Sequence, residues 1–494
     1  MLDEAVSRVR RRTILLVAAP LVGVATLMIG LRIGAGDAVR AASIFAAPPG
    51  RPATPGGPVP LSLQILTYAE DRGVRETIAL RDLSLVVRTK GREARWSGAS
   101  NVDGIAEANV AIDGLATGDA VDVELRMEGE ALPLAAGALG WRTVPWARTA
   151  GAQGGRAAVR PARREGPIDL DVLVEGERLV PGFVTPVWVR ASRASTIEVE
   201  PEAGLRVGHE HVTTCAGGWA EIDAFAEGHV VGMGLRARAA DTATGAPAAM
   251  GAPAAVGAPA AMGQWFGPLP VAPGAFFVGM PRILPEGRPN DVTLVAPNPR
   301  HVVYAEVDDE VGRVFAAALD VAPDPGDAVP RAHLTLPPLA PGLHWLVVSG
   351  EPRGAERLAG AAIAKPFLVG IGAGQEPCAI GPWLAERPAE GFPRWLAVDG
   401  MAVRGAKNRA RHRIGLALGL AALLAAAILD ALLLVAAARE ARARMLLAEA
   451  AATGDEEHAA SRIVAEPPGG SLAVALLIAV LGFALLAALV YAKG

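Results

Sequence analysis

The chain has 494 residues, of which 51% are hydrophobic but only 4% are aromatic, so alanine, valine and leucine supply most of its apolar character. Its formal net charge of −4 creates no field that would attract a polyanion, and the sequence has no basic helix or aromatic-and-arginine strand. These features exclude nucleic acid as a partner.

Apolar residues are concentrated in three runs, at residues 13–31, 414–438 and 471–491. Each run reaches the roughly 20 residues that a helix needs to cross a bilayer. The sequence therefore predicts three transmembrane α-helices, one N-terminal and two C-terminal, with the lipid bilayer as a partner.

The first run follows residues 1–12, which contain Arg8, Arg10, Arg11 and Arg12. A cleaved signal peptide also begins in this way, but here the apolar run is longer than the usual 7–15 residues and residues 36–38 make a poor cleavage site. We therefore expect an uncleaved anchor in the membrane, most simply a bacterial inner membrane, with residues 1–12 in the cytoplasm.

In this topology the central part of the chain is extracytoplasmic, in the periplasm, and residues 439–470 form a cytoplasmic loop. One observation weighs against it. A comparable number of positive charges flanks the second run on its outer side, at Arg404, Lys407, Arg409, Arg411 and Arg413. Long exported domains weaken the charge rule, so the expected orientation stands.

Between the first two runs, short segments of alternating apolar and polar residues are separated by glycine, proline and aspartate. They include residues 61–65, 83–87, 121–125, 187–191 and 333–336. This pattern predicts a mostly β fold with tandem Ig-like β-sandwiches. We place the sandwiches at residues 58–130, 168–278 and 279–370, followed by a membrane-proximal segment at residues 371–412. The tryptophans of that segment, Trp383 and Trp395, are expected near the membrane interface.

The first two expected sandwiches share a local pattern. Residues 100–110 and 214–224 each place a polar turn with glycine before an Ala-Glu strand, and each is followed by a strand that ends in Leu-Arg. The second also has an early Pro-Gly turn at Pro181 and Gly182. In these features the chain resembles macroglobulin-like and related bacterial Ig-like sandwiches. The resemblance does not imply covalent trapping, because neither Cys215 nor Cys378 lies in the Cys-Gly-Glu-Gln thioester motif.

Residues 245–263 repeat a six-residue Gly-Ala-Pro unit three times. Glycine and proline at this density predict a flexible loop rather than a helix or a strand. Strand-like sequence resumes at residues 264–266, so we expect the repeat to be a loop within the second sandwich.

The sequence contains no nucleophile elbow, phosphate loop, dinucleotide fingerprint or zinc-protease helix, which favours a protein that is not an enzyme and needs no cofactor. His209 and His211 fall on one face of a strand, with Cys215 and His229 close in sequence, and could hold zinc. A solvated strand explains these residues equally well.

Two further features leave alternatives open. Cys215 and Cys378 could form one disulfide in an oxidising compartment. Asp308, Asp309 and Glu310 precede Gly312 and could bind calcium, but they most simply cap a hairpin between residues 302–307 and 313–319.

Asp430 lies within the second apolar run, where a carboxylate costs about 2.5–3.5 kcal/mol and should avoid lipid. It could reach cytoplasmic water or pair with Arg439 or Arg442, form a hydrogen bond between helices, or relay protons or ions. Gly415 and Gly419 in the same run have the small-residue spacing that allows close helix packing.

The sequence thus predicts a membrane-anchored protein that acts through contacts with other membrane or envelope proteins, in a homo- or hetero-oligomer. Its expected role is that of a structural or accessory component of an envelope complex. One alternative is a subunit of a transport or ion-driven machine that uses Asp430. The other is a metal-dependent hydrolase that uses His209 and His211.

Overall fold

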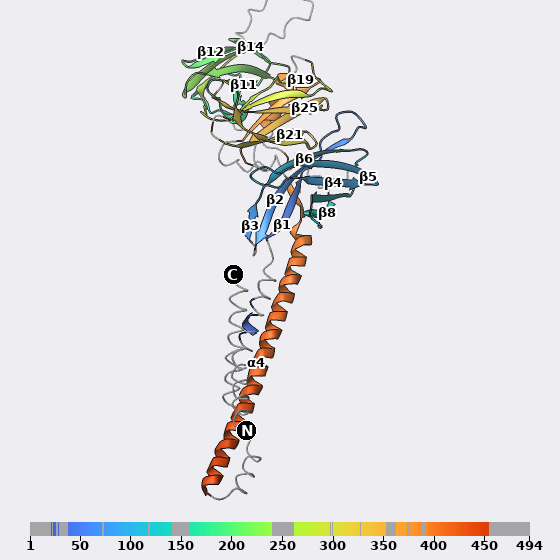
Figure 1. Cartoon of the computed structure of the whole chain (residues 1–494). Coiled ribbons are helices and arrows are strands. Elements are labelled where there is room, and N and C mark those ends of the chain that lie inside the picture. Colours follow the sequence, from blue (N-terminus) through green and yellow to red (C-terminus); the bar gives the residue numbers. More distant parts are fainter. Residues whose placement is uncertain are drawn as a thin grey trace, which may run out of the picture. The chain divides into compact units, whose positions relative to one another are not determined.

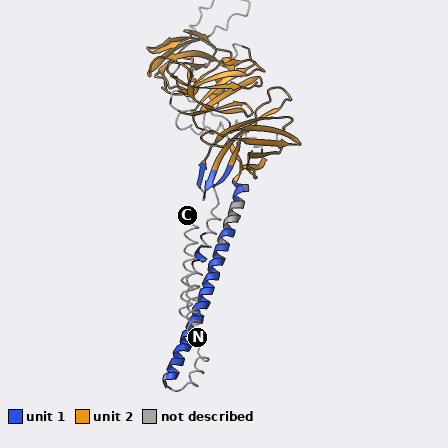
Figure 2. Ribbon diagram, viewed as in Figure 1, with its two compact units in different colours: residues 1–41, 69–76, 401–494 blue, residues 42–68, 77–400 orange. Residues whose placement is uncertain are grey.

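The computed structural model describes most of the central chain and one long helix (Figure 1). The described residues are 21, 23–25, 28, 38–71, 74–116, 119–140, 158–239, 261–296, 298, 300–326, 328–351, 362–372, 376–386, 392 and 394–453. The rest of the first predicted span and all of the third, residues 471–491, lie outside them. The chain forms two compact units, one comprising residues 1–41, 69–76 and 401–494 and the other residues 42–68 and 77–400 (Figure 2).

The first sandwich packs two sheets around one apolar core. One sheet contains β27 (Trp395–Asp399), β1 (Val39–Ala46), β2 (Val59–Asp71) and β3 (Val74–Thr77), with β6 (Ile105–Ile112) also paired to β2. The other contains β5 (Arg92–Gly98), β4 (Leu83–Thr89), β7 (Val121–Met127) and β8 (Ala135–Leu139). The sandwich is therefore larger than residues 58–130, because β1, β8 and the distant β27 complete it.

The second sandwich has sheets ordered β10-β11-β15-β13 and β14-β12-β16-β17-β9. Its elements are β9 (Arg163–Glu165), β10 (Leu170–Val174), η1 (Glu175–Glu177), β11 (Val184–Ala191), β12 (Ser195–Pro201), β13 (Leu205–Val207), β14 (His211–Thr213), β15 (Trp219–Ala226), β16 (Val231–Ala239) and β17 (Met262–Leu269). Arg238 of β16 pairs with Met262 of β17. The Gly-Ala-Pro repeat therefore connects two neighbouring strands of this sandwich.

The third sandwich has sheets ordered β18-β20-β24-β23 and β19-β26-β25-β21-β22. Its strands are β18 (Phe277–Gly279), β19 (Ile283–Leu284), β20 (Asn290–Val295), β21 (Val302–Asp309), β22 (Arg313–Asp320), β23 (Ala322–Pro323), β24 (Pro330–Leu336), β25 (Gly342–Ser349) and β26 (Ile363–Val369). All eight residues of β21 are buried. The second sheet is therefore covered on its outer face as well as on its core face.

The structure confirms the mostly β prediction. Each of the five alternating segments lies within a strand, and β4 shows the expected pattern, with Leu83, Leu85 and Val87 buried while Ser84 and Arg88 are exposed. Alternate side chains of a strand point to opposite faces, so one apolar set fills the sandwich core.

Residues 371–412 do not form a single membrane-proximal segment. They contain α3 (Glu376–Glu386), β27 and the first turns of α4 (Met401–Thr453). The expectation for Trp383 was wrong, because this side chain is 3% exposed and packs in an apolar cluster with Trp345 and Ile380. Trp395 pairs with Ala46 in the first sandwich. Trp383 is therefore accounted for by tertiary burial, and Trp395 is half-buried against the core of the first sandwich.

Among the described residues, one helical segment is long and apolar enough to cross a bilayer, Arg413–Glu449 within α4. The helix has 53 residues and also includes the basic flank before the apolar run. At 1.5 Å per residue it is about 80 Å long, well beyond the roughly 30 Å of a hydrocarbon core.

Candidate functional site

The second sandwich and α3 pack against the outer face of the β19-β26-β25-β21-β22 sheet. Its side chains Trp345, Val347 and Leu368 are at most 4% exposed. They form one apolar cluster with Trp188 and Trp219 of the second sandwich and with Ile380, Trp383 and Leu384 of α3. Trp345 and Trp383 have ring centroids 5.3 Å apart. The third sandwich is thus joined to the second through a shared core.

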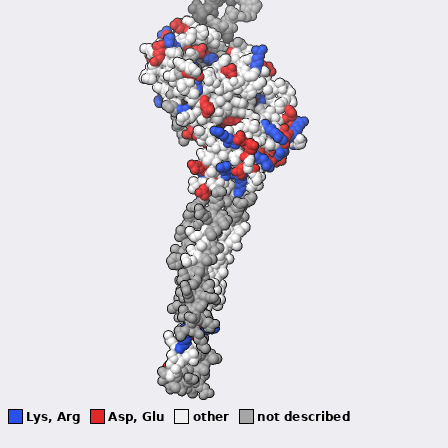
Figure 3. All heavy atoms as spheres, in the orientation of Figure 1, with Lys and Arg blue, Asp and Glu red and all other residues white. Residues whose placement is uncertain are grey.

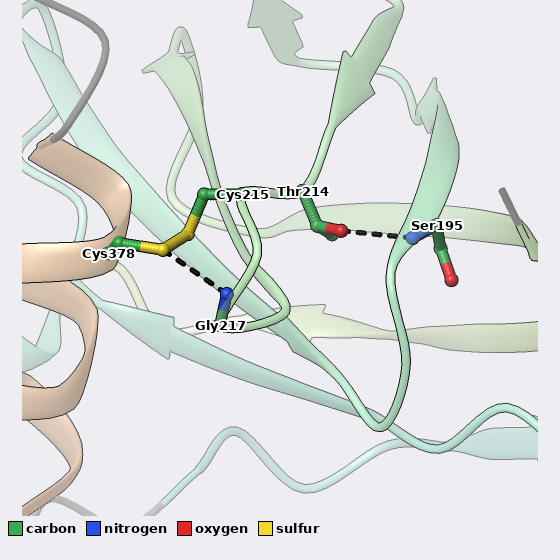
Figure 4. The surroundings of a disulfide bond; sticks show 5 residues. All are labelled: Ser195, Thr214, Cys215, Gly217 and Cys378. Carbon is green, nitrogen blue, oxygen red and sulfur yellow. Dashed lines mark hydrogen bonds between the residues drawn. A yellow bond between two sulfur atoms is a disulfide. The ribbon is translucent and has the colours of Figure 1, made fainter. Parts of the chain in front are cut away.

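A disulfide holds α3 at this face. Cys378 of α3 is bonded to Cys215 in the turn before β15, with Cα atoms 6.0 Å apart (Figure 4). The Gly217 N–H also donates to Cys378 Sγ at 3.3 Å. Gly381 lies directly against the Trp219 ring, so that a Cβ there would collide with it. The sequence left this disulfide as one possibility, and the structure shows that it joins α3 to the second sandwich.

Charged groups reinforce the junction between the second and third sandwiches. Glu175 is 3% exposed; it accepts a hydrogen bond from Trp188 Nε1 at 3.4 Å and lies 3.6 Å from Lys365 Nζ. Arg282, just before β19, pairs with Glu221 and Asp223 of β15. Burial lowers the pKa of Arg282, although Glu175 and Glu376 act in the opposite direction. The carboxylates compensate for the buried cations.

The junction between the first and third sandwiches contains a cluster of five buried charged residues, here called the ion cluster. It consists of Glu107 on β6, Glu306 and Asp308 on β21, Arg313 on β22, and Arg394 just before β27. Arg394 Nη1 donates to both oxygens of Glu107, at 2.9 and 3.1 Å, and Arg394 Nη2 lies 2.5 Å from Glu306 Oε1. Arg394 therefore links the two sandwiches.

Arg313 completes the ion cluster. Its Nη2 bonds to Glu306 and to the Phe392 carbonyl, and its Nε lies 3.5 Å from Asp308 Oδ1. Asp308 Oδ2 accepts a hydrogen bond from the Phe392 N–H at 3.0 Å. Burial raises the pKa of Glu107, which Arg394 partly offsets. Burial also raises the pKa of Asp308, to about 7, against the attraction of Arg313.

Uncharged groups seal the same junction. Asn109 of β6 donates to the Ala316 carbonyl at 2.7 Å and accepts from the Ala316 N–H at 3.0 Å, so its amide takes the place of a neighbouring strand at the β22 edge. The Tyr304 hydroxyl bonds to Asn101 and Asp103 in the turn before β6.

Asp309 is used as a hairpin cap. Its Oδ1 accepts from the Val311 and Gly312 N–H groups, at 2.7 and 2.8 Å, and its Oδ2 accepts from the Arg51 N–H at 2.7 Å. Both carboxylate oxygens are therefore occupied by backbone donors. The structure favours the hairpin over the calcium interpretation.

The sequence pattern shared by residues 100–110 and 214–224 supplies residues of both junctions, that of the first sandwich and that of the second sandwich with the third. Gly104 and Gly218 occupy the same position before β6 and β15, with φ of +75° and +79°, a conformation that glycine adopts without strain. Three and five residues later the strands carry Glu107 and Asn109 in the first sandwich, and Glu221 and Asp223 in the second. Residues two apart on a strand share a face. Each strand thus presents one polar pair to residues outside its own sandwich core. On β6, Glu107 contacts Arg394 and Asn109 contacts Ala316, and on β15 both Glu221 and Asp223 contact Arg282.

The histidines proposed as zinc ligands are not gathered into a site. His209, His211 and His229 are exposed, and Cys215 is held in the disulfide. In the described part of the chain, no three His, Cys, Asp or Glu side chains are placed to hold a metal ion. Cys215 therefore has no free thiolate to offer the predicted zinc site.

Asp430, Gly415 and Gly419 lie on one buried stripe of α4, together with Leu423 and Ala427. Asp430 is 3% exposed, and its Oδ1 has no hydrogen-bond partner among the described residues. Large apolar side chains such as Leu418, Ile428 and Leu432 are exposed on the remaining surface. Gly23 of the first predicted span packs so closely on Ala426 that a Cβ would collide with it. The carboxylate therefore belongs to the helix-packing side.

The exposed charges of the first sandwich differ from those of the ion cluster. Arg88, Glu93, Arg95, Glu124 and Arg126 form ion pairs across β5, β4 and β7. Figure 3 shows basic and acidic side chains intermingled on the molecular surface. Side-chain hydrogen bonds from Arg88 and Arg95 lower the pKa of Glu93. Such surface pairs contribute little to stability, so this face is a solvated one.

Sequence reasoning missed both junctions, although two signals were present. β25 and β26 are apolar almost without alternation, as is expected of strands covered on both faces. The strand β21 carries Glu306 and Asp308 at alternate positions, after the apolar residues 302–305 and before Asp309. Charges at that spacing share one face, and pairing across sandwiches is what allows their burial.

No family model and no curated protein sequence matches this chain. Similar solved structures include a Salmonella alpha-2-macroglobulin mutant (14% identity, 67% of this chain, 25% of that chain, TM-score 0.15) and a tetra-tandem repeat of a large adhesion protein (13%, 67%, 74%, 0.15). Red sea bream transglutaminase is a third (14%, 42%, 32%, 0.16), so the chain spans about a third of that protein. Macroglobulin-like and Ig-like proteins are among these neighbours, in agreement with the weak sequence resemblance. TM-scores this low support no argument about function.

Proposed function

We propose that this chain is a membrane-anchored protein whose extracytoplasmic part acts by protein contacts, as a structural or accessory component of an envelope complex. In this proposal residues 13–31, 414–438 and 471–491 span the membrane. The sandwiches would face the periplasm, and the partners would be other membrane or envelope proteins.

The observation that carries the proposal is the pair of buried junctions. Sandwiches connected only by linkers pivot freely, whereas a large apolar interface removes this freedom. Here a shared tryptophan cluster, a disulfide and the ion cluster make residues 42–68 and 77–400 one compact unit. Such a unit offers partners one fixed surface. The chain of that unit runs directly into the apolar helix, because β27 ends at Asp399 and α4 begins at Met401.

The topology is tested with a cysteine in the Gly-Ala-Pro repeat. The Ala254→Cys variant, in a background with Cys215 and Cys378 retained, should react with a membrane-impermeant thiol reagent in intact cells whose outer barrier admits it. The expected labelling is close to complete, because the glycine- and proline-rich repeat is solvated in the proposed topology. Labelling is measured by mass spectrometry of the purified chain.

Two controls make the outcome decisive. The parent chain should stay unlabelled, since its two cysteines are joined in the disulfide. An Ala451→Cys variant near the end of α4 should react only after the inner membrane is permeabilised. The opposite pattern, with position 451 reactive in intact cells and position 254 protected, would reverse the topology.

The second candidate function, a subunit of a transport or ion-driven machine, is favoured by one observation. Asp430 is almost fully buried on the packing side of α4, and carboxylates in membrane helices are costly enough to mark functional sites. If the chain is a scaffold, Asp430→Asn should leave the composition of the complex unchanged when it is purified in mild detergent. Subunit composition is measured by quantitative mass spectrometry against the unmodified chain.

A matched control lies on the exposed side of α4. Leu432→Asn places the same amide on a side chain that is 63% exposed and so separates a general effect of polarity from an effect at Asp430. Unchanged subunits together with loss of the complex's ion-driven activity in Asp430→Asn alone would favour the machine over the scaffold.

A further inference from the structure

The ion cluster contains more carboxylates than cations. Three carboxylates, Glu107, Glu306 and Asp308, face two guanidiniums, those of Arg313 and Arg394. The adjacent pair of Arg51 and Asp309 adds one charge of each sign. The side chains of all five members of the cluster are at most 9% exposed. A fully ionised cluster therefore holds one uncompensated negative charge in a buried place, which is costly.

Geometry identifies the carboxylate with the least compensation. Glu107 receives two hydrogen bonds from Arg394 and one from Gln64 Nε2, at 2.7 Å. Glu306 contacts both guanidiniums. Among the described residues, Asp308 has only the Phe392 N–H at 3.0 Å and the more distant Arg313 Nε at 3.5 Å as partners, and it is 0% exposed. The surplus charge is thus least well satisfied at Asp308.

We propose that the junction between the first and third sandwiches is a proton-linked lock, in which Asp308 takes up a proton as the pH falls below neutrality and the sandwiches are then held together more tightly. This inference concerns the junction alone and does not depend on the proposed function.

The sign of the effect follows from the pKa values. An ordinary aspartate titrates near pH 3.9. Burial raises the pKa of Asp308 to about 7, and the nearby Glu306 adds to this while Arg313 and Arg394 oppose it. Between these two values the closed junction binds a proton that the opened one releases. The stabilisation is therefore fully present at acid pH and is lost as the pH rises through about 7.

The other titratable groups around Asp308 do not all act in the same direction. Glu107 also has a raised pKa, so it acts in the same direction. Burial lowers the pKa of His344 of β25, beside Asp309, so its contribution has the opposite sign, but it is present equally in the unmodified chain and in Asp308→Asn. The carboxylates with lowered pKa values, Glu93, Glu124 and Asp119, lie on the other face of the first sandwich and are not members of the ion cluster.

Hydrogen exchange of the full-length protein in detergent tests the lock. The Ala316 N–H, which bonds to Asn109 across the junction, reports opening. After correction for the intrinsic exchange rate, the opening equilibrium constant of the unmodified chain should rise by up to tenfold per pH unit between pH 5 and pH 7. Asp308→Asn, which cannot ionise at this position, should show a markedly smaller slope.

Two further variants keep the test decisive. Glu93→Gln, on the exposed face, should retain the slope of the unmodified chain. Glu107→Gln removes the surplus charge at another member of the cluster and should flatten the slope even if Asp308→Asn does not fold. A flat profile in the unmodified chain would overturn the proposal. So would a slope in Asp308→Asn, or in Glu107→Gln, that equals the slope of the unmodified chain.

Discussion

Replacing Arg394 by alanine should lower the free energy of unfolding of the unit formed by residues 42–68 and 77–400 by about 3–5 kcal/mol, because it leaves buried carboxylates without their cation. Arg394 is 3% exposed and contacts both Glu107 and Glu306, which are 3% and 9% exposed. Neither carboxylate can be rehydrated while the junction stays closed. Chemical denaturation followed by tryptophan fluorescence measures the loss, since Trp345 and Trp188 lie in the shared core.

A matched control uses an arginine that also contacts two glutamates. Arg88 pairs with Glu93 and Glu124, but its side chain is 48% exposed. Arg88→Ala should therefore cost less than about 1 kcal/mol. Adding Glu107→Gln to Arg394→Ala should recover part of the stability, because one of the unpaired charges is then removed. Equal losses in Arg394→Ala and Arg88→Ala would show that the ion cluster does not hold the sandwiches together.

Removing the disulfide by replacing both Cys215 and Cys378 with alanine should cost up to about 5 kcal/mol in the chain-entropy model, since the bond joins residues 163 positions apart. The apolar contacts of Ile380, Trp383 and Leu384 remain, so α3 should stay at the junction with a lower melting temperature. Calorimetry with and without reductant measures the change.

The unmodified chain supplies the control for this prediction. Reductant should lower its melting temperature to that of the double alanine variant and should leave the variant unchanged. If reductant has no effect on the unmodified chain although free thiols are detected, the tryptophan cluster alone holds α3. The tie between the second sandwich and α3 would then contribute nothing to stability.

Local patterns explain why so many strands could be predicted from sequence. The alternation in residues 83–87 and 121–125 reflects strands with one face in a core and one in water, which is a property of each segment by itself. Residues 439–453, the beginning of the expected cytoplasmic loop, instead continue α4 as a helix as far as Thr453. The turn glycines Gly104 and Gly218 were visible in the sequence because each follows a polar turn pattern, and both have positive φ.

The sequence alone determined the strand segments, the apolar character of α4 and the one possible pairing of Cys215 with Cys378. Only the tertiary structure decided that β27 closes the first sandwich, that Trp383 lies between the second and third, and that Glu107, Glu306 and Arg394 meet. Glu107 and Arg394 are 287 residues apart. A charged residue in a period-two strand looks the same in sequence whether its face meets water or another domain. What distinguishes the two cases is the oppositely charged partner, which only folding brings into contact.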